Sequence, residues 1–178
     1  MNESDGSVHN PHLQISVIPA SLEQKPILAN LLELYSHDFS SFVDLEIGPD
    51  GRFGYEGLDS YWVDADRHPF LIYLANKLAG FVLIDGVPGA QPDDPTWDVA
   101  EFFVLRGYRR RGIGSQAAHE VFRRFPGHWQ VRVRESNQPA CHFWKHATAQ
   151  FAGEAVRSKR MFSGGANRQV FWFDSSRV

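Results

Sequence analysis

Six consecutive residues, Arg109-Arg110-Arg111-Gly112-Ile113-Gly114, combine positive charge with glycine in a pattern that suits an anionic ligand. Glycine lets the backbone approach a phosphate without a Cβ clash, and the first N–H groups of a following helix are unpaired and lie at positive potential. The turn therefore predicts a phosphate cradle that ends at Ser115. Two alternatives stay open: the glycines could only permit tight packing, and the arginines could form a solvated face.

A carboxylate, Glu101, lies in the middle of the apolar strand that precedes this turn. Simple alternation predicts that Glu101 shares a face with Val99 and Phe103, and that Asp98 lies on the opposite face. Because an unpaired buried carboxylate costs free energy, Glu101 is the first candidate for a base or an amine anchor. Asp98 is the second candidate. The alternatives are an ion pair with an arginine for Glu101 and a surface charge for Asp98.

The elements that position these groups follow from hydrophobic periodicity. β-Branched and aromatic residues over positions 97–104 predict a strand. Ile113, Ala117, Val121 and Phe125 recur at helical spacing, which predicts a helix that Pro126-Gly127 ends. The chemistry-bearing turn therefore joins a strand to the N-terminus of a helix.

The rest of the chain predicts an α/β (α+β) fold, a mixed sheet with helices packed on it. The expected elements are a strand over 13–18, a helix to about residue 36 with Pro26 in its first turn, a short helix over 39–45, a hairpin of 70–75 and 78–84, a loop over 85–95, a strand over 128–134, a helix capped by Asn137, and strands over 151–157 and 169–174.

Length and composition limit the function classes. A chain of 178 residues favours one domain, over residues 13–178, after a polar tail over 1–12 that we expect to be disordered. A net charge of −3 argues against nucleic-acid binding. The single cysteine, Cys141, excludes an internal disulfide and favours a reducing, cytoplasmic location. No apolar run has the length of a membrane span.

Two motifs in register resemble the GNAT N-acetyltransferase superfamily. Arg109-x-x-Gly112-x-Gly114 is similar to its Gln/Arg-x-x-Gly-x-Gly/Ala turn, and Asn137-x-x-Ala140-x-x-Phe143-Trp144 is similar to a second segment of that superfamily. The strand from Glu101 and the turn after it look most like spermidine/spermine-type small-amine acetyltransferases. The resemblance implies a mostly antiparallel central sheet with helices on both faces, forming one acyl-CoA N-acyltransferase domain.

The resemblance also implies acetyl-CoA as cosubstrate and no metal. The pyrophosphate would bind the backbone from Arg109 to Ser115, including Ile113, and the pantetheine would pair with the strand beside Phe103 and Val104. Asn137 would donate a hydrogen bond to the pantetheine, and Phe143 would flank its thiol end. Whether each arginine side chain contacts phosphate, and whether Asn137 is only a helix cap, stay open.

The implied activity is direct attack of a primary amine on the thioester. Trp144 stands where many relatives carry a tyrosine that can protonate the departing thiolate, so the sequence identifies no general acid. The alternative is a non-catalytic acyl-CoA-binding or regulatory module. The acidic composition of residues 37–67 favours a cationic acceptor, a small amine or a peptide amine. A homodimer stays open, whereas nucleic acid and membrane are not expected partners.

Overall fold

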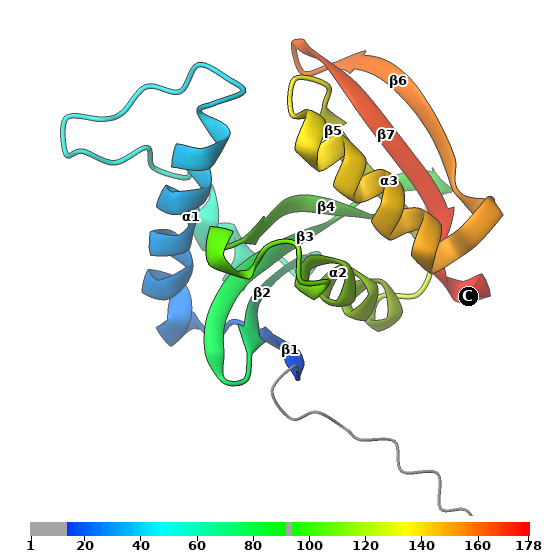
Figure 1. The fold of residues 1–178 in the computed structure, drawn as a ribbon, viewed down its shortest axis with the longest axis horizontal. Coiled ribbons are helices and arrows are strands. Elements are labelled where there is room, and N and C mark those ends of the chain that lie inside the picture. Colours follow the sequence, from blue (N-terminus) through cyan, green and yellow to red (C-terminus); the bar gives the residue numbers. More distant parts are fainter. Residues whose placement is uncertain (1–13, 92–93) are drawn as a thin grey trace, which may run out of the picture.

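The computed structural model describes residues 14–91 and 94–178 and consists of one seven-stranded sheet with helices on both faces (Figure 1). The strands follow the order β1-β2-β3-β4-β5-β7-β6, and every neighbouring pair is antiparallel except β4 and β5. The expected fold class is therefore confirmed. The elements are β1 (Ile15–Pro19), α1 (Lys25–Phe39), β2 (Arg67–Leu74), β3 (Lys77–Gln91), β4 (Asp94–Val104), α2 (Ile113–Arg124), β5 (His128–Arg134), α3 (Gln138–Ala152), β6 (Arg157–Ser163) and β7 (Ala166–Asp174).

Helix α1 covers one face of the sheet. Leu28, Leu31 and Leu32 are buried at helical spacing, and Pro26 lies in the first turn, as the sequence predicts. The helix continues beyond the expected end near Ser36, because Phe39 stacks on Tyr35 one turn earlier with the ring centroids 5.5 Å apart. The expected short helix over 39–45 is absent, and the chain stays irregular up to a 3-10 helix, Leu58–Trp62.

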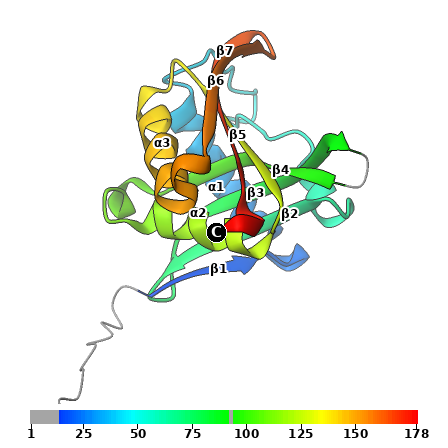
Figure 2. The ribbon, with the colours of Figure 1, turned by 90° about the vertical axis from the view of Figure 1, so that its right-hand side faces the viewer.

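Helices α2 and α3 cover the other face, as Figures 1 and 2 show. Their common core centres on Phe122, whose ring meets Trp129 and Phe173 edge-to-face at centroid distances of 4.9 and 4.8 Å. Asn137 caps α3, since its Oδ1 accepts a hydrogen bond from the Ala140 N–H at 3.0 Å. None of the helices in the described ranges is long and apolar enough to cross a membrane.

Residues 85–91 and 94–95 lie in strands β3 and β4 rather than in the expected loop. β3 continues to Gln91 and pairs with the first half of β4, with Gly86 opposite Trp97 and Val87 opposite Thr96. Glycine, proline and aspartate lower strand propensity locally, but cross-strand pairing overrides that preference here. Pro92 and Asp93 lie outside the described residues, as does the expected tail over 1–12.

The prediction of a strand over residues 151–157 is also wrong. α3 runs to Ala152 because Phe151 is 7% exposed and continues the buried helical stripe of Trp144 and Ala147. The strand that follows, β6, is an edge strand whose residues are nearly all exposed, so it carries no alternating pattern for the sequence to reveal.

Strands β4 and β5 separate part-way along their length, and this opening positions the site. Their parallel pairing covers three residue pairs and ends at Asp98 opposite Gln130. Beside the opening, β4 carries a β-bulge at Ala100, since Val99 pairs with Ile84 but Glu101 pairs with Leu83.

The β-bulge changes which side chains share a face. Val99 and its partner Ile84 belong to the core under α2 and α3, whereas Leu83, opposite Glu101, belongs to the core under α1. Glu101 therefore shares a face with Phe103, as expected, but not with Val99. Asp98 lies on the same face as Glu101, which corrects the expectation that the two carboxylates point to opposite sides.

Candidate active site

A cavity of about 390 Å³ lies between the end of β4 and the first turns of α2 and α3. Its walls come from three parts of the chain: α1 with the residues just after it; β4, the basic turn (residues 106–112) and the beginning of α2; and the beginning of α3. The lining residues are Tyr35, Asp38, Phe39, Phe42, Phe102, Phe103, Val104, Arg109, Arg110, Gly114, Asn137, Pro139, Ala140, Phe143 and Trp144. We refer to this space as the turn-side cavity.

The glycine-bearing turn shapes one wall of the turn-side cavity. Arg110 and Gly112 adopt left-handed backbone conformations, with φ of 57° and 76°, and Gly112 immediately precedes α2. A Cβ on Gly114 would lie 3.0 Å from Cε2 of Phe143, so the missing side chain makes room for that ring. Phe143 stacks on Phe102 of β4 at a centroid distance of 5.6 Å. The absence of a side chain at Gly114 therefore lets the beginning of α2 lie close to Phe143 in the cavity wall.

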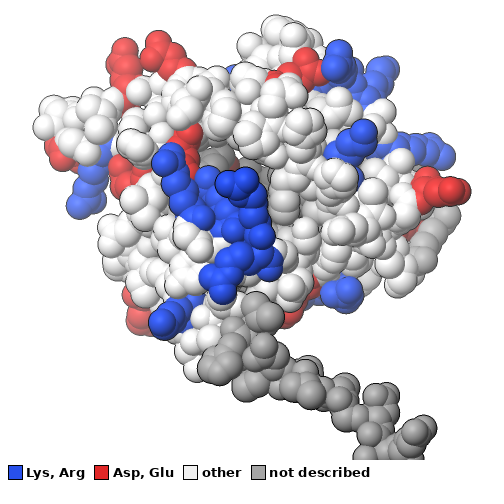
Figure 3. Space-filling model, viewed as in Figure 1, with Lys and Arg blue, Asp and Glu red and all other residues white. Residues whose placement is uncertain are grey.

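Positive charge gathers beside this cavity. Arg106, Arg109, Arg110 and Arg111 are exposed, and Figure 3 shows basic side chains grouped at a hollow near the beginning of α2. A helix N-terminus and neighbouring guanidinium groups both favour a bound anion. The residues present therefore fit the phosphate groups of a coenzyme A ester.

Two of these arginines are held by Asp38 at the end of α1. Arg109 donates from Nη2 to Oδ2 of Asp38 at 2.6 Å and from Nε to the Val104 carbonyl at 2.7 Å. Arg106 donates from Nη2 to Oδ1 of Asp38 at 2.6 Å. Burial raises the pKa of Asp38, but the hydrogen bonds from Arg106 and Arg109 outweigh it and hold the pKa below its ordinary value. The pair of ion pairs ties α1 to the basic turn.

The structure brings most of the expected cofactor residues together. Seven of them line the turn-side cavity, namely Phe103, Val104, Arg109, Arg110, Gly114, Asn137 and Phe143. The other four do not line it, namely Arg111, Gly112, Ile113 and Ser115. Ile113 is 1% exposed and points into the core, so only its backbone could meet a phosphate. Asn137 is a helix cap and also a wall residue, and the two roles are compatible.

A second cavity, of about 290 Å³, occupies the opening between β4 and β5. We refer to it as the strand-gap cavity. It shares six wall residues with the turn-side cavity, so the two spaces adjoin each other. Its lining residues are Tyr35, Phe39, Val99, Ala100, Glu101, Phe102, Val131, Arg132, Val133, Arg134, Asn137, Ala140, Trp144 and Arg168.

Glu101 is the carboxylate in the wall of the strand-gap cavity. The Tyr55 hydroxyl donates to its Oε1 at 3.4 Å, and the Tyr35 hydroxyl is a further hydrogen-bond donor to it. Burial raises the pKa of Glu101 to about 7, although the hydrogen bonds from Tyr35 and Tyr55 act to lower it. A carboxylate with such a pKa exchanges its proton readily near neutral pH, which is the property of a general base.

Asp98 has a different environment. Its side chain is 1% exposed, and both of its oxygens accept hydrogen bonds from Arg132, from Nε at 3.2 Å and from Nη2 at 2.5 Å. Burial raises the pKa of Asp98, and the hydrogen bonds from Arg132 oppose that rise. Asp98 lines neither cavity. The structural ion pair considered for Glu101 is thus formed by Asp98.

Trp144 forms an apolar part of both cavity walls. Its indole is 6% exposed, and its ring meets Phe102 and Phe143 edge-to-face at centroid distances of 5.0 and 4.8 Å. An indole N–H cannot deliver a proton near neutral pH. The tyrosine hydroxyls closest to the candidate base come instead from α1 and from the irregular segment, as Tyr35 and Tyr55.

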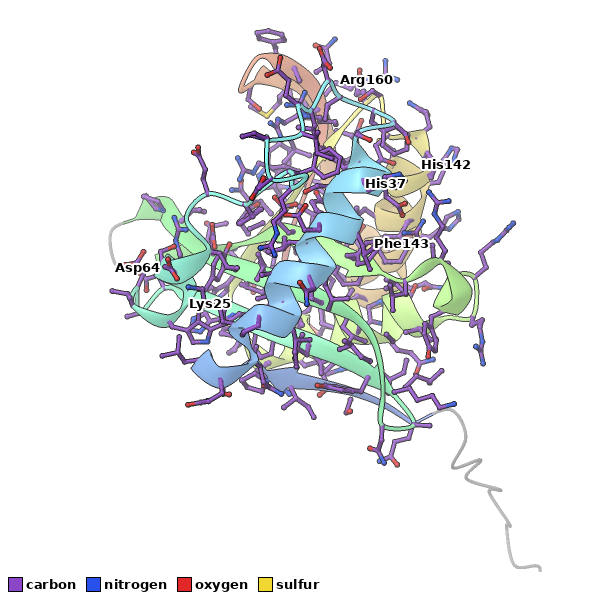
Figure 4. All side chains as sticks on the ribbon, turned by 90° about the vertical axis from the view of Figure 1, so that its left-hand side faces the viewer. Lys25, His37, Asp64, His142, Phe143 and Arg160 are labelled. Carbon is purple, nitrogen blue, oxygen red and sulfur yellow. The ribbon has the colours of Figure 1, made fainter. Side chains whose placement is uncertain are left out.

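The acidic residues of segment 37–67 do not line the strand-gap cavity. Asp38 binds the two arginines of the basic turn, Asp59 forms an ion pair with Lys25, and Asp64 lies 3.5 Å from Arg67. In Figure 4, Lys25 and Asp64 lie well apart from Phe143. None of the acidic charge expected to attract a cationic acceptor therefore faces the strand-gap cavity, and Asp38, which lines the turn-side cavity, is paired with arginines.

Several wall residues were not predicted from the sequence. Tyr35 repeats at helical spacing with the leucines of α1, and Tyr55 lies in a segment without periodicity. Arg132 and Arg134 occupy the polar positions of β5, opposite in direction to Trp129, Val131 and Val133. The alternation of β5 was visible in the sequence, but the cavity beneath its polar face was not.

Comparison with known proteins identifies the family of this chain. The model of the acetyltransferase (GNAT) family matches residues 28–147, which include both motifs and Glu101. The comparison with curated proteins gave no match. Residues 14–91 and 94–178 contain no group of three or more His, Cys, Asp or Glu side chains placed to hold a metal ion.

Solved structures with the same fold include an acetyltransferase from Thermus thermophilus, with a TM-score of 0.67, 18% identity and coverage of 92% of this chain and 98% of that one. NAA60 from Arabidopsis thaliana in complex with acetyl-CoA has a TM-score of 0.61 at 19% identity, with coverage of 90% and 99%. A spermidine N-acetyltransferase SpeG chimera from Vibrio cholerae and hSSAT has a TM-score of 0.58 at 14% identity, with coverage of 92% of this chain and 97% of that one. At these identities the likeness shows the fold.

Proposed function

The chain belongs to the GNAT acetyltransferase family, and from that premise we propose that it is an acetyl-CoA-dependent N-acetyltransferase. A primary amine attacks the thioester directly, without an acyl-enzyme. The two adjoining cavities support this proposal because each suits one reactant. The turn-side cavity takes acetyl-CoA, and the strand-gap cavity takes the amine.

Acetyl-CoA binding uses the residues around the turn-side cavity. The first N–H groups of α2 and the guanidinium of Arg110 bind the phosphates, and the pantetheine lies along the open edge of β4. Phe103, Asn137 and Phe143 line that path. Acetyl-CoA supplies the acetyl group as a thioester, whose carbonyl carbon accepts the amine.

Glu101 is the observation that carries the proposal. An amine must lose a proton before it attacks, and Glu101 has a pKa of about 7 in the wall of the cavity next to the cofactor. The carboxylate takes the proton from the ammonium group, the nitrogen forms a bond to the carbonyl carbon, and the carbon–sulfur bond breaks. The nitrogen releases its second proton to solvent as the amide forms. The CoA thiolate leaves and takes a proton from solvent, because Trp144 cannot supply one.

The test is release of free CoA thiol from acetyl-CoA over a panel of primary amines. We expect Glu101→Gln to lower kcat about 10²–10⁴-fold while the Kd for CoA stays unchanged. Glu120→Gln is the matched control, since Glu120 forms a surface ion pair with Arg124 and lies outside both cavities. Tight binding of acetyl-CoA without CoA release from any amine would instead support the alternative, a non-catalytic acyl-CoA-binding or regulatory module.

A further inference from the structure

Three arginines line the wall of the strand-gap cavity, in which Glu101 is the single acidic residue: Arg132 and Arg134 from β5, and Arg168 from β7. Arg132 and Arg134 are two residues apart on one strand, so they point to the same face. Arg134 is the direct partner of Arg168 in the antiparallel β5–β7 ladder. The three guanidinium groups therefore form a cluster on one face of the sheet.

This cluster is only partly neutralised. Arg132 is paired with Asp98, whereas the Arg134 guanidinium forms no hydrogen bond or ion pair with any residue in the described ranges. Arg168 donates from Nε to the Ser163 carbonyl at 3.2 Å and has no carboxylate partner there. Like charges directly opposite each other destabilise a sheet, so the pairing of Arg134 with Arg168 opposes folding.

The electrostatic environment of Arg168 agrees with that reading. Its pKa is lowered, first by burial and then by the positive charges of Arg134 and Arg132, and the carboxylates of Asp98 and Glu101 do not compensate fully. Glu101 itself is about half protonated at neutral pH, since its pKa is about 7. The cavity is therefore positive on the side of β5 and β7.

We propose that the acceptor amine carries an anionic group, a carboxylate or a phosphate-type group, which Arg134 and Arg168 bind while the amine faces Glu101. The inference rests on the proposed function and adds the substrate class. Arginine forms paired hydrogen bonds to both kinds of anion. The apolar side chains of Ala140 and Trp144 line the cavity as well, and its volume of about 290 Å³ suits a small molecule such as an amino acid.

Matched compounds test the substrate class. Glycine, β-alanine and 4-aminobutyrate are compared with methylamine, ethylamine and propylamine, with 2-aminoethylphosphonate and putrescine as further members. Binding to the CoA-loaded protein is measured by calorimetry, and turnover by thiol release from acetyl-CoA. We expect an acid-bearing member to bind at least tenfold more tightly, and to react with higher kcat/KM, than its alkylamine partner. The aminophosphonate arm distinguishes a phosphate-type anion from a carboxylate.

Substitutions assign the preference to the cluster. Arg134→Gln and Arg168→Gln should each raise the KM for the preferred acid-bearing amine by roughly ten- to a hundredfold, and should change the KM for the matching alkylamine by a much smaller factor. Arg160→Gln is the control on the same sheet, because Arg160 is 81% exposed, pairs with Glu135 and lines no part of the cavity. Arg134→Gln should keep or gain thermal stability, since it removes a repulsion.

The outcomes separate this inference from the proposed function. Acid-selective binding that needs Arg134 or Arg168, without CoA release, supports the anion site and sinks the acetyltransferase. Release of CoA that is equally fast with alkylamines or putrescine, and insensitive to both substitutions, supports the acetyltransferase and overturns the anion site. Absence of any preference for acid-bearing amines, in binding and in turnover, also overturns it.

Discussion

The two cavities differ in how far apart in the sequence their lining residues lie. The turn-side cavity is formed largely by two continuous motifs, residues 109–114 and 137–144, which adjoin helix N-termini. The strand-gap cavity takes its charged residues from β4, β5 and β7, which pairing and packing bring together. A short motif can encode binding to a cofactor that many proteins share, whereas recognition of the acceptor depends on residues that no local pattern connects.

A large expected effect concerns the buried ion pair between Asp98 and Arg132, compared with an exposed ion pair. Asp98→Asn removes the buried partner of Arg132, and we expect a loss of about 2–4 kcal/mol in the free energy of unfolding, measured by urea denaturation. Asp59→Asn is the control: this residue is 79% exposed and pairs with Lys25, so its loss should cost less than about 1 kcal/mol. Equal effects of the two changes would mean that the Asp98–Arg132 pair does not hold the gap together.

The next prediction concerns CoA affinity and a substitution in the wall of the turn-side cavity. Gly114→Val places methyl groups against Phe143, whose Cε2 already lies 3.0 Å from where a Cβ would be. We expect the Kd for CoA to rise about tenfold or more, since the first turn of α2 must move. Gly107→Val is the control, because a Cβ on Gly107 would meet no atom within 4 Å. Unchanged CoA affinity in Gly114→Val would remove α2 from the binding site.

The sequence predicted the fold class, and it singled out the residues of the two motifs that line the turn-side cavity, because both depend on local signals. The arginine–glycine turn, the Asn137 cap and the stripe of α2 each act within a few residues. The sequence could not predict that Glu101 shares a face with Asp98 rather than with Val99. The β-bulge at Ala100 arises from pairing with β3, and simple alternation does not include it. Nor could the acidic residues of segment 37–67 be assigned, because Asp38 and Asp59 find their partners through tertiary contacts.

The arginine cluster of the strand-gap cavity could not be predicted from the sequence either. Arg132 and Arg134 look like solvent-facing residues of an alternating strand, and Arg168 lies 34 positions after Arg134. Their proximity depends on the antiparallel register that places Arg134 opposite Arg168. Because positive charge lines this cavity and the acidic residues of segment 37–67 do not, the proposed acceptor class is the opposite of the one that composition alone suggested.

The smallest expected effect concerns the pKa of Glu101. Tyr55→Phe keeps the ring but removes a hydrogen bond to the carboxylate, and that bond lowers the pKa. The pKa of Glu101 should therefore rise above about 7, and kcat/KM at pH 7 should fall less than tenfold and recover at higher pH. Tyr108→Phe, which alters a hydroxyl outside both cavities, is the control.

Stability gives an independent measure of the same pKa. The folded-state pKa of about 7 exceeds the reference value of 4.5, so the folded protein binds this proton more tightly than the unfolded chain does. The free energy of unfolding should then fall as the pH rises from about 4.5 to about 7, and Glu101→Gln should remove that part of the fall. In Tyr55→Phe the fall should extend to higher pH, and the rate profile should move with it. A rate profile that moves while the stability profile does not would assign the titration to the substrate amine rather than to Glu101.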